Sequence, residues 1–441
     1  MAKLRNDYET SRWARFLSWM KGESDALDKS AVHALGEKAH PNQRSEAEHA
    51  AIEKAREERA EQTVQNERLI QDHMHEWSKT KGARIVTVFY RLSAIIVCAL
   101  IIYVLLGSVT VVIDPFFHYH APLPFLQYDI FYQRYQNDGI IKHFDYDAVI
   151  TGNSLCENFK SSELDALFGT HSVKVPFSGA SSKELDLNDR AAIKANSDIR
   201  LIVMDIDCDN LISDKDMMSY DASDYPSFLY DSNPFNDVKY LFNKSIFKYS
   251  LDVLSYTRSG QTTTSFDDYS FWDTPDEASY GQAVILQNYE RPGALDLDPQ
   301  LDETTLERLH GNIEQNILET ARANPQIDFY LFIPPFSMYY WDKQQRLGQL
   351  DFRFEAEREV IEMLLACENI HLFSFTDEFD LVQDFDRYKD YIHYDSGVNS
   401  WMLGCMAAGE HELTWDNYEA YLARVQEFYS GYDYDALFPE S

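Results

Sequence analysis

Basic residues are scarce in this sequence. Its 441 residues include 39 Lys and Arg against 73 Asp and Glu, a formal net charge of −34 at pH 7. A chain this acidic repels the phosphate backbone, which argues against nucleic acid as a partner. Residues 1–91 hold 16 basic and 15 acidic residues, so nearly all of the excess negative charge lies after them. This asymmetry indicates segments that lie in different environments.

Cysteines are also few, and they are widely spaced. One lies in a hydrophobic run, and the other four are spread through the larger part of the chain: Cys156, Cys208, Cys367 and Cys405. The spacing is unlike a disulfide scaffold or a zinc site, so we expect mostly buried thiols, although an even number leaves disulfides open. His118 and His120 stand two apart without an acidic or cysteine cluster, so we expect them to form a wall just outside the membrane or to pack on the domain rather than to bind a metal. The sequence indicates no metal site and no cofactor.

Charge is absent from one long run, Leu92 to Ile113. Its 22 residues are enough to cross a bilayer at about 1.5 Å per residue. Basic residues precede the run and Asp114 follows it, so the positive-inside rule orients the chain. We expect a polar, helical cytoplasmic segment at 1–91, a transmembrane helix at 92–113 and an extracytoplasmic domain at 114–441.

The large domain alternates strand and helix patterns. Short apolar runs bounded by turn residues predict strands at 147–151, 172–177, 199–206, 328–334 and 370–375. Helical patterns lie between most of them, at 155–168, 182–195, 303–323 and 352–367. This alternation predicts an α/β fold with a parallel sheet covered on both faces, and ligands bind such sheets at the carboxyl ends of the strands. Residues 207–302 interrupt the pattern with an aromatic-rich insertion that suits either sugar binding or a satellite hydrophobic cluster.

The G-x-S-x-G elbow of the α/β-hydrolases is missing. After the first strand the chain reads Gly152-Asn153-Ser154, where a serine is either a helix cap or a nucleophile. Near the C-terminus, Asp390 and His393 are three residues apart, a spacing that brings side chains together on one helical turn. Both blocks follow strands at the same edge of the expected sheet. We therefore predict a triad of Ser154 as nucleophile, His393 as base and Asp390 as orienting acid.

These two blocks resemble the SGNH (GDSL-like) hydrolases, in which a G-x-S block follows the first strand and a D-x-x-H block lies near the C-terminus. The membrane-anchored arrangement is most similar to the DltD-like and alginate-acetylation-like members. The resemblance implies a three-layer α/β/α sandwich with a five-stranded parallel sheet. It also implies action on a cell-surface glycan or related polymer beside a membrane-bound O-acyltransferase.

The family also builds an oxyanion hole from a Gly block and an Asn block. Gly179, after the second strand, matches the Gly block, and Asn210 is the nearest asparagine after the third strand, although no glycine precedes it. Tyr339 and Trp341 follow the fourth strand, so they either line the cleft as substrate-binding residues or pack in the core. Ser178, beside Gly179, is a rival nucleophile.

Two functions follow from these observations. The first is a membrane-anchored serine acyltransferase or esterase that forms an acyl-enzyme on Ser154. The second is a domain of the same fold without catalysis, which binds glycan or acts as a scaffold in a polymer-modifying complex. An intact Ser-His-Asp set favours the first, and the incomplete Asn block and the aromatic insertion favour the second.

Overall fold

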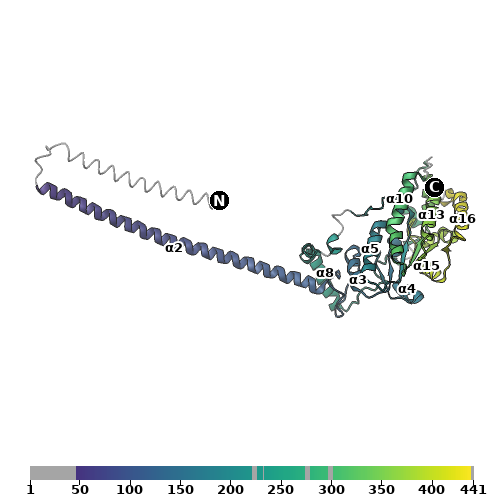
Figure 1. Ribbon diagram of the computed structural model, residues 1–441, viewed down its shortest axis with the longest axis horizontal. Helices are drawn as coiled ribbons and strands as arrows, with labels where there is room; N and C mark the ends of the chain where they lie inside the picture. Colours follow the sequence, from purple (N-terminus) through teal and green to yellow (C-terminus); the bar gives the residue numbers. More distant parts are fainter. Residues whose placement is uncertain (1–45, 221–225, 232, 274–278, 296–300, 439–441) are drawn as a thin grey trace. The chain divides into compact units, whose positions relative to one another are not determined.

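A computed structural model of the protein describes residues 46–220, 226–231, 233–273, 279–295 and 301–438 (Figure 1). The first half of the expected cytoplasmic segment, residues 1–45, lies outside the described residues. Two compact units divide the chain between Ala99 and Leu100, and each is described by itself.

A single helix, α2 (Glu46–Ile113), contains both the polar helical stretch and the hydrophobic run. No proline interrupts its 68 residues, so the helix continues through the change from charged to apolar composition. Its apolar part reaches a mean hydropathy of 2.9 over 18 residues, of which 11% are buried. By length and composition this is one helix capable of crossing a membrane, and its apolar side chains are exposed rather than packed in a core.

The sheet has six strands in the order β2-β1-β3-β4-β5-β6. The strands are β1 (Ala148–Ile150), β2 (Ser172–Lys174), β3 (Leu201–Asp205), β4 (Asp328–Ile333), β5 (Ile370–Ser374) and β6 (Glu412–Leu413). The first five are parallel and correspond to the five expected runs, and β6 joins β5 antiparallel. The expectation of five strands therefore missed β6, because a two-residue strand leaves no periodic signal.

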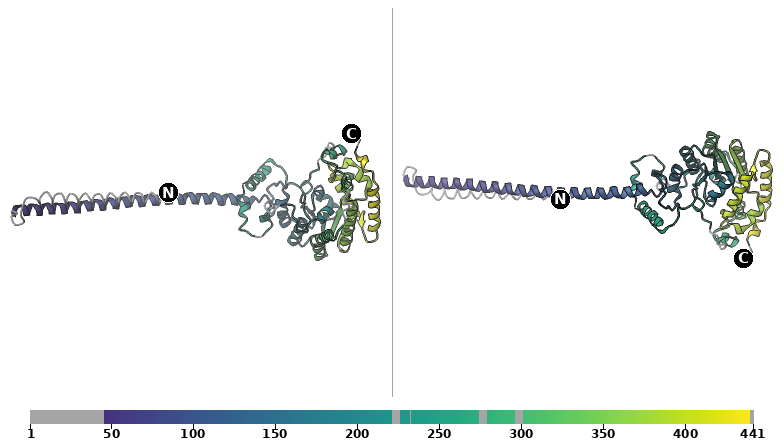
Figure 2. Two further views of the ribbon diagram at one scale, coloured as in Figure 1. Left: turned by 90° about the horizontal axis from the view of Figure 1, so that it is seen from above. Right: turned by 90° about the horizontal axis from the view of Figure 1, so that it is seen from below.

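Helices cover both faces of the sheet (Figures 1 and 2). The connection from β1 to β2 runs in the opposite direction to the later connections, so right-handed crossovers place its helix on the other face. That helix is α4 (Ser161–Phe168), which packs with α15 (Ser396–Ala408). The other face carries α3 (Gln133–His143), α5 (Ser182–Ala195), α10 (Glu303–Ile313), the π-helical turn η4 (Glu314–Leu318), α11 (Glu319–Ala323), α13 (Leu350–Leu365) and α16 (Tyr418–Gly431).

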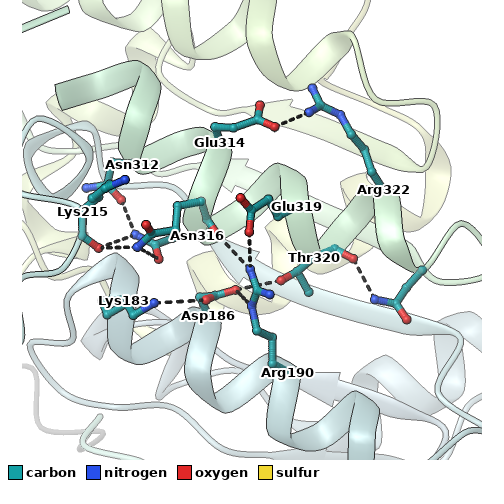
Figure 3. A network of polar contacts seen from close by, with 12 residues as sticks. Lys183, Asp186, Arg190, Lys215, Asn312, Glu314, Asn316, Glu319, Thr320 and Arg322 are labelled. Carbon is teal, nitrogen blue, oxygen red and sulfur yellow. Dashed lines mark hydrogen bonds and ion pairs between the residues drawn. The ribbon is translucent and has the colours of Figure 1, made fainter. Parts of the chain in front are cut away.

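A polar network joins α5 to the α10–η4–α11 helix (Figure 3). The buried carboxylate of Asp186 accepts hydrogen bonds from Arg190 Nε and Thr320 Oγ1, each at 2.7 Å. Arg190 also donates to the Gln315 carbonyl oxygen at 2.9 Å and to Glu319. Because the buried carboxylate and its partners come from two crossover helices, the network fixes how these helices lie on the sheet.

The chain crosses in one direction from β1 to β2 and in the other direction from β3 to β4. The crossovers therefore reverse between the neighbouring strands β1 and β3. In open parallel sheets the loops leaving the two strands beside such a point diverge to opposite faces and leave a crevice at their carboxyl ends. The loop after β1 contains Ser154, and Asp205 is the last residue of β3. The strand order alone therefore places these two loops at the position where a ligand is expected.

The insertion at 207–302 is helical, and no strand lies in the part of it that the structure describes. It contains α6 (Cys208–Leu211), η2 (Ser227–Leu229), α7 (Val238–Leu241), α8 (Lys244–Ser259) and α9 (Gln282–Asn288). Leu229, Tyr240 and Ile246 form a second hydrophobic cluster with Phe116. This confirms a satellite cluster for the first half of the insertion.

Shorter helices complete the domain: η1 (Ser154–Cys156), α12 (Met338–Arg346), α14 (Phe379–Gln383), η5 (Phe385–Arg387) and η6 (Tyr434–Leu437). All five cysteines are free thiols, and all but Cys98 are buried, as expected from their spacing.

Candidate active site

Ser154 begins the short helix η1 directly after β1. The cap of that helix is not the serine but Asn153, whose side-chain oxygen accepts from Leu155 N at 2.8 Å. The hydroxyl of Ser154 is therefore not used in capping, and its side chain is partly exposed. Of the two interpretations of this serine, the helix cap is excluded by the neighbouring asparagine.

Glycine is required at position 152 for two reasons. Its φ of +125° lies in a region that favours glycine, and a Cβ there would collide with Asp205 Oδ1 and Cys156 Sγ. Asp205 Oδ1 also accepts from the backbone N–H of Asn153 at 2.8 Å. The end of β3 thus holds the turn that presents Ser154.

Ser154, His393 and Asp390 lie in one hydrogen-bonded row. Ser154 Oγ is 2.8 Å from His393 Nε2, and His393 Nδ1 is 2.8 Å from Asp390 Oδ2. Since the Asp390 carboxylate can only accept, Nδ1 carries the proton and Nε2 is left to accept from the serine hydroxyl. This is the geometry that removal of a proton from serine requires.

The Asp390–His393 segment is a tight loop rather than the helical turn expected from its spacing. Tyr388 and Tyr394 pair as an antiparallel bridge on either side of it, and Lys389 N donates to the His393 carbonyl oxygen at 3.0 Å. Asp390 Oδ1 accepts from Ile392 N and His393 N, each at 2.8 Å. The carboxylate therefore orders its own loop with one oxygen and the imidazole with the other.

Asp390 stays ionised in this loop. Burial by itself would raise the pKa of its carboxyl, but hydrogen bonds from the His393 ring and from two backbone N–H groups bring the pKa below its ordinary value. The side chains of His393 and Asp390 remain about one quarter exposed, at 26% and 25%. The imidazole is thus oriented by an anion and is still partly open to solvent.

The predicted oxyanion residues lie on neighbouring loops. Gly179 has a φ of +62° in the loop after β2, which is joined to the Ser154 loop by a bond from Phe177 N to the Gly152 carbonyl oxygen at 2.9 Å. Within the described part of the chain, the backbone N–H groups of Ser154 and Gly179 donate no hydrogen bond. Both remain available to an anionic oxygen.

Asn210 supports this loop rather than presenting its amide to the serine. Its Nδ2 donates to the Ala180 carbonyl oxygen at 3.1 Å, and its backbone carbonyl oxygen accepts from the side chain of Asn312. The absence of a glycine before Asn210 in the sequence is consistent with a different placement of this side chain. The Asn210 amide is therefore engaged by the Ala180 carbonyl oxygen, whereas the backbone N–H groups of Ser154 and Gly179 are unengaged among the described residues.

Glu157 is a buried carboxyl near His393 that the sequence analysis did not select. It accepts from Gln133 Nε2 at 2.6 Å, and Gln133 Oε1 accepts from the backbone N–H of Ser178 at 2.7 Å. Burial raises the pKa of Glu157, against the hydrogen bond from Gln133 and the charge of His393. Ser178, the rival nucleophile, thus lies beside an acid and an amide, and in the described part of the chain its side chain makes no hydrogen bond to a histidine.

Trp272 is a second residue that the sequence analysis missed. Its ring meets the His393 ring edge to face, with centroids 5.5 Å apart, and its Nε1 donates to the Ser154 carbonyl oxygen at 3.2 Å. The Lys389 ammonium lies 4.1 Å from the Trp272 ring. The second half of the insertion therefore reaches the triad, and the aromatic content of "FDDYSFW" was the available signal.

Tyr339 and Trp341 are core residues, which corrects their expected role in substrate binding. Both are buried, at 0% and 3% exposed. Tyr339 donates to the Leu437 carbonyl oxygen at 3.0 Å, and Trp341 stacks on Tyr429 with centroids 4.0 Å apart. Both belong to α12, which turns them inward, and a sequence pattern cannot distinguish this from a cleft wall.

No model of a known protein family matches the chain, and no curated protein matches it. What is established is an α/β domain with a mostly parallel six-stranded sheet, preceded by a long helix with an apolar stretch.

Proposed function

We propose that residues 114–441 form an extracytoplasmic serine acyltransferase or esterase, anchored by the apolar part of α2. The substrate class is an acyl ester of a cell-surface polysaccharide or related polymer. The single observation that carries the proposal is the continuous row from Ser154 Oγ through His393 to Asp390, with both gaps at 2.8 Å.

The chemistry proceeds in two halves. Ser154 Oγ bonds to the acyl carbonyl carbon while His393 takes the hydroxyl proton and Asp390 stabilises the imidazolium. The backbone N–H groups of Ser154 and Gly179 bind the oxyanion. His393 then gives its proton to the departing alcohol, which leaves an acyl ester on Ser154. In the second half an acceptor hydroxyl or water attacks this ester, and His393 removes the proton of the attacking group.

The assignment to SGNH-like hydrolases is part of the proposal. It is supported by the two sequence blocks, by the strand order that places the serine loop at the reversal point, and by crossover helices on both faces of the sheet. The orientation, with the N-terminus cytoplasmic, rests on the basic residues that precede the span. A membrane-bound O-acyltransferase that delivers the acyl group is the partner that this assignment suggests.

The test is labelling of the purified full-length chain with a serine-reactive fluorophosphonate, followed by peptide mapping. We expect one adduct, on Ser154, that disappears in Ser154→Ala and in His393→Ala. The control Ser178→Ala should label like the unaltered protein.

The second candidate, a non-catalytic glycan-binding or scaffolding module, is favoured by the engagement of Asn210 with Ala180. A protein that is folded by circular dichroism and takes no label at Ser154 would favour this candidate. The proposed enzyme would then be abandoned.

A further inference from the structure

The first part of the insertion lies against the outer end of the apolar helix. The ring of Phe242, directly after α7, stacks on Tyr103 with centroids 3.4 Å apart and an interplanar angle of 10°. A Cβ at Gly107 would lie 3.0 Å from the Phe242 ring, so glycine allows the close approach. Thr110 Oγ1 lies 3.4 Å from the Leu241 carbonyl oxygen. The turn between α7 and α8 therefore contacts the same residues that are apolar enough to lie in a bilayer.

Asp114 fixes this arrangement at the end of α2. Its fully buried carboxylate accepts from the backbone N–H groups of His118, Tyr119 and His120, at 3.0, 2.7 and 3.0 Å. It also accepts from the Tyr240 hydroxyl of α7 at 2.6 Å. Four hydrogen bonds to one carboxylate tie the end of the span to α7, so α7 and α8 are held at the depth of the helix end.

Helix α8 has an inner face and an outer face of different chemistry. Ile246, Ser250 and Val253 are buried against the domain. Leu251 and Leu254 point outward and are 48% and 43% exposed. Their spacing of three residues puts them on one face. On a helix that is already packed on its other face, the two leucines form a small exposed apolar strip.

The charge of this segment is opposite to that of the rest of the domain. Residues 238–259 contain four basic residues and one acidic residue: Lys239, Lys244, Lys248, Arg258 and Asp252. Residues 92–441 as a whole contain 23 basic and 58 acidic residues. Lys244, Lys248 and Arg258 are exposed, and Lys248 is 3.6 Å from Asp252. An exposed apolar strip flanked by cations is the composition of a helix that lies in a membrane interface.

We propose that α7 and α8 form a membrane-docking surface, in which Leu251 and Leu254 enter the boundary between headgroups and acyl chains and the flanking cations bind anionic lipid headgroups. The inference rests on the membrane span of the proposed function and not on the triad. A lipid occupant is favoured over a protein partner because this surface is continuous with the span through Phe242 and Tyr103. Docking would hold the acidic domain at a fixed distance and tilt above the bilayer.

The test uses the full-length chain in lipid nanodiscs with nitroxide spin labels and collision agents. Native Cys98, which is exposed in the span, carries the first label. The other two labels are introduced in a Cys98→Ser background by Leu251→Cys on α8 and by Ala420→Cys on α16. Ala420 is an exposed residue, and α16 lies at the opposite end of the domain from α8 (Figures 1 and 2). We expect oxygen, which concentrates in lipid, to be the stronger collision partner at 98 and 251. A water-soluble nickel complex should be the stronger one at 420.

The outcomes separate the two proposals. A label at 98 that meets only the nickel complex would overturn the membrane span and the docking surface together. Oxygen contact at 98 with nickel contact at 251 would overturn the docking surface and leave the span standing. Spin–spin broadening between labels at 251 would show a second copy of the chain on this face and would also overturn lipid docking.

The electrostatic part has its own test. Oxygen contact at 251 should increase when zwitterionic nanodiscs are replaced by ones that contain anionic phosphatidylglycerol. The combined variant Lys244→Gln, Lys248→Gln and Arg258→Gln should lose this increase. A response to phosphatidylglycerol that is the same with and without the three cations would overturn the role assigned to them.

Discussion

Ser154 Oγ and His393 Nε2 lie 2.8 Å apart although 239 positions separate them in the chain. The serine follows the first strand of the sheet and the histidine follows the fifth, and the loops of the parallel strands bring them to one edge. The Asp390 carboxylate and the Trp272 ring hold the histidine from two sides.

Asp390→Asn should inactivate the site and leave the fold intact. The asparagine oxygen can still accept from the backbone N–H groups of Ile392 and His393, but its NH₂ group would face His393 Nδ1. The imidazole would then carry its proton on Nε2 and could not accept from Ser154. We expect the rate of phosphonate labelling to fall by about 10⁴-fold, the order found when a triad carboxylate becomes an amide. Asp386→Asn, at an exposed carboxylate on η5, is the control and should label normally.

Asp205 should make stability depend on pH. Burial raises the pKa of its carboxyl to about 6, against the hydrogen bond from Asn153 N–H. Because the native protein keeps this proton when the unfolded chain, with a pKa of 3.8, has lost it, the free energy of unfolding should fall as the pH rises from about 4 to about 6. Asp205→Asn keeps an acceptor for Asn153 and should remove this part of the pH dependence in urea titrations.

Asp205→Ala gives the matched comparison. It removes the acceptor and leaves the Asn153 N–H buried, which should cost about 1–3 kcal/mol and slow labelling of Ser154. Equal pH profiles for the unaltered protein and Asp205→Asn would contradict the assignment of this titration to Asp205.

Gly152→Ala should be more damaging than an ordinary glycine substitution. The new Cβ would meet Asp205 Oδ1 and Cys156 Sγ at a φ of +125°. We expect a loss of about 2 kcal/mol or more in the free energy of unfolding, with reduced labelling of Ser154. Gly169→Ala is the control, because its φ of +65° is also positive but nothing lies within 4 Å of its Cβ position. There the loss should be about 1 kcal/mol with labelling unchanged. Similar losses of unfolding free energy at both positions would show that contact with Asp205 and Cys156 adds nothing to the cost of a Cβ at position 152.

Two tryptophans should respond oppositely to replacement by phenylalanine. Trp272→Phe removes the N–H bond to the Ser154 carbonyl oxygen at a partly exposed position, and we expect slower labelling with a stability change below about 1.5 kcal/mol. Trp341→Phe opens space beside Tyr429 and Phe354 in the core, which should cost about 1–3 kcal/mol and leave the labelling rate of the folded protein unchanged. Slower labelling in Trp341→Phe at full stability would restore its predicted place in substrate binding.

Most of the sheet could be predicted from the sequence because its strands are short, apolar and bounded by turns. The five parallel strands were found in this way, whereas β6 has two residues and no pattern. The helix α5 was predicted with its observed bounds, since a capping box of Ser181 and Glu184 begins it and its apolar positions repeat with the helical period. Helix α8 was not predicted. It lies in the aromatic-rich insertion, where the helical period of its apolar residues was not recognised.

The chain by itself determined the residue types of the site, the apolar run and the order of strands and helices, since these depend on local composition and periodicity. Only the tertiary structure decided which side chains meet. In that structure Asn153 caps the short helix, and the hydroxyl of Ser154 lies against His393. Tyr339 and Trp341 are buried in the core. The tertiary structure also brought Trp272 of the insertion to the triad and Phe242 to the apolar helix. These contacts join residues far apart in the sequence, and they depend on the direction in which a helix or loop faces, which no local pattern specifies.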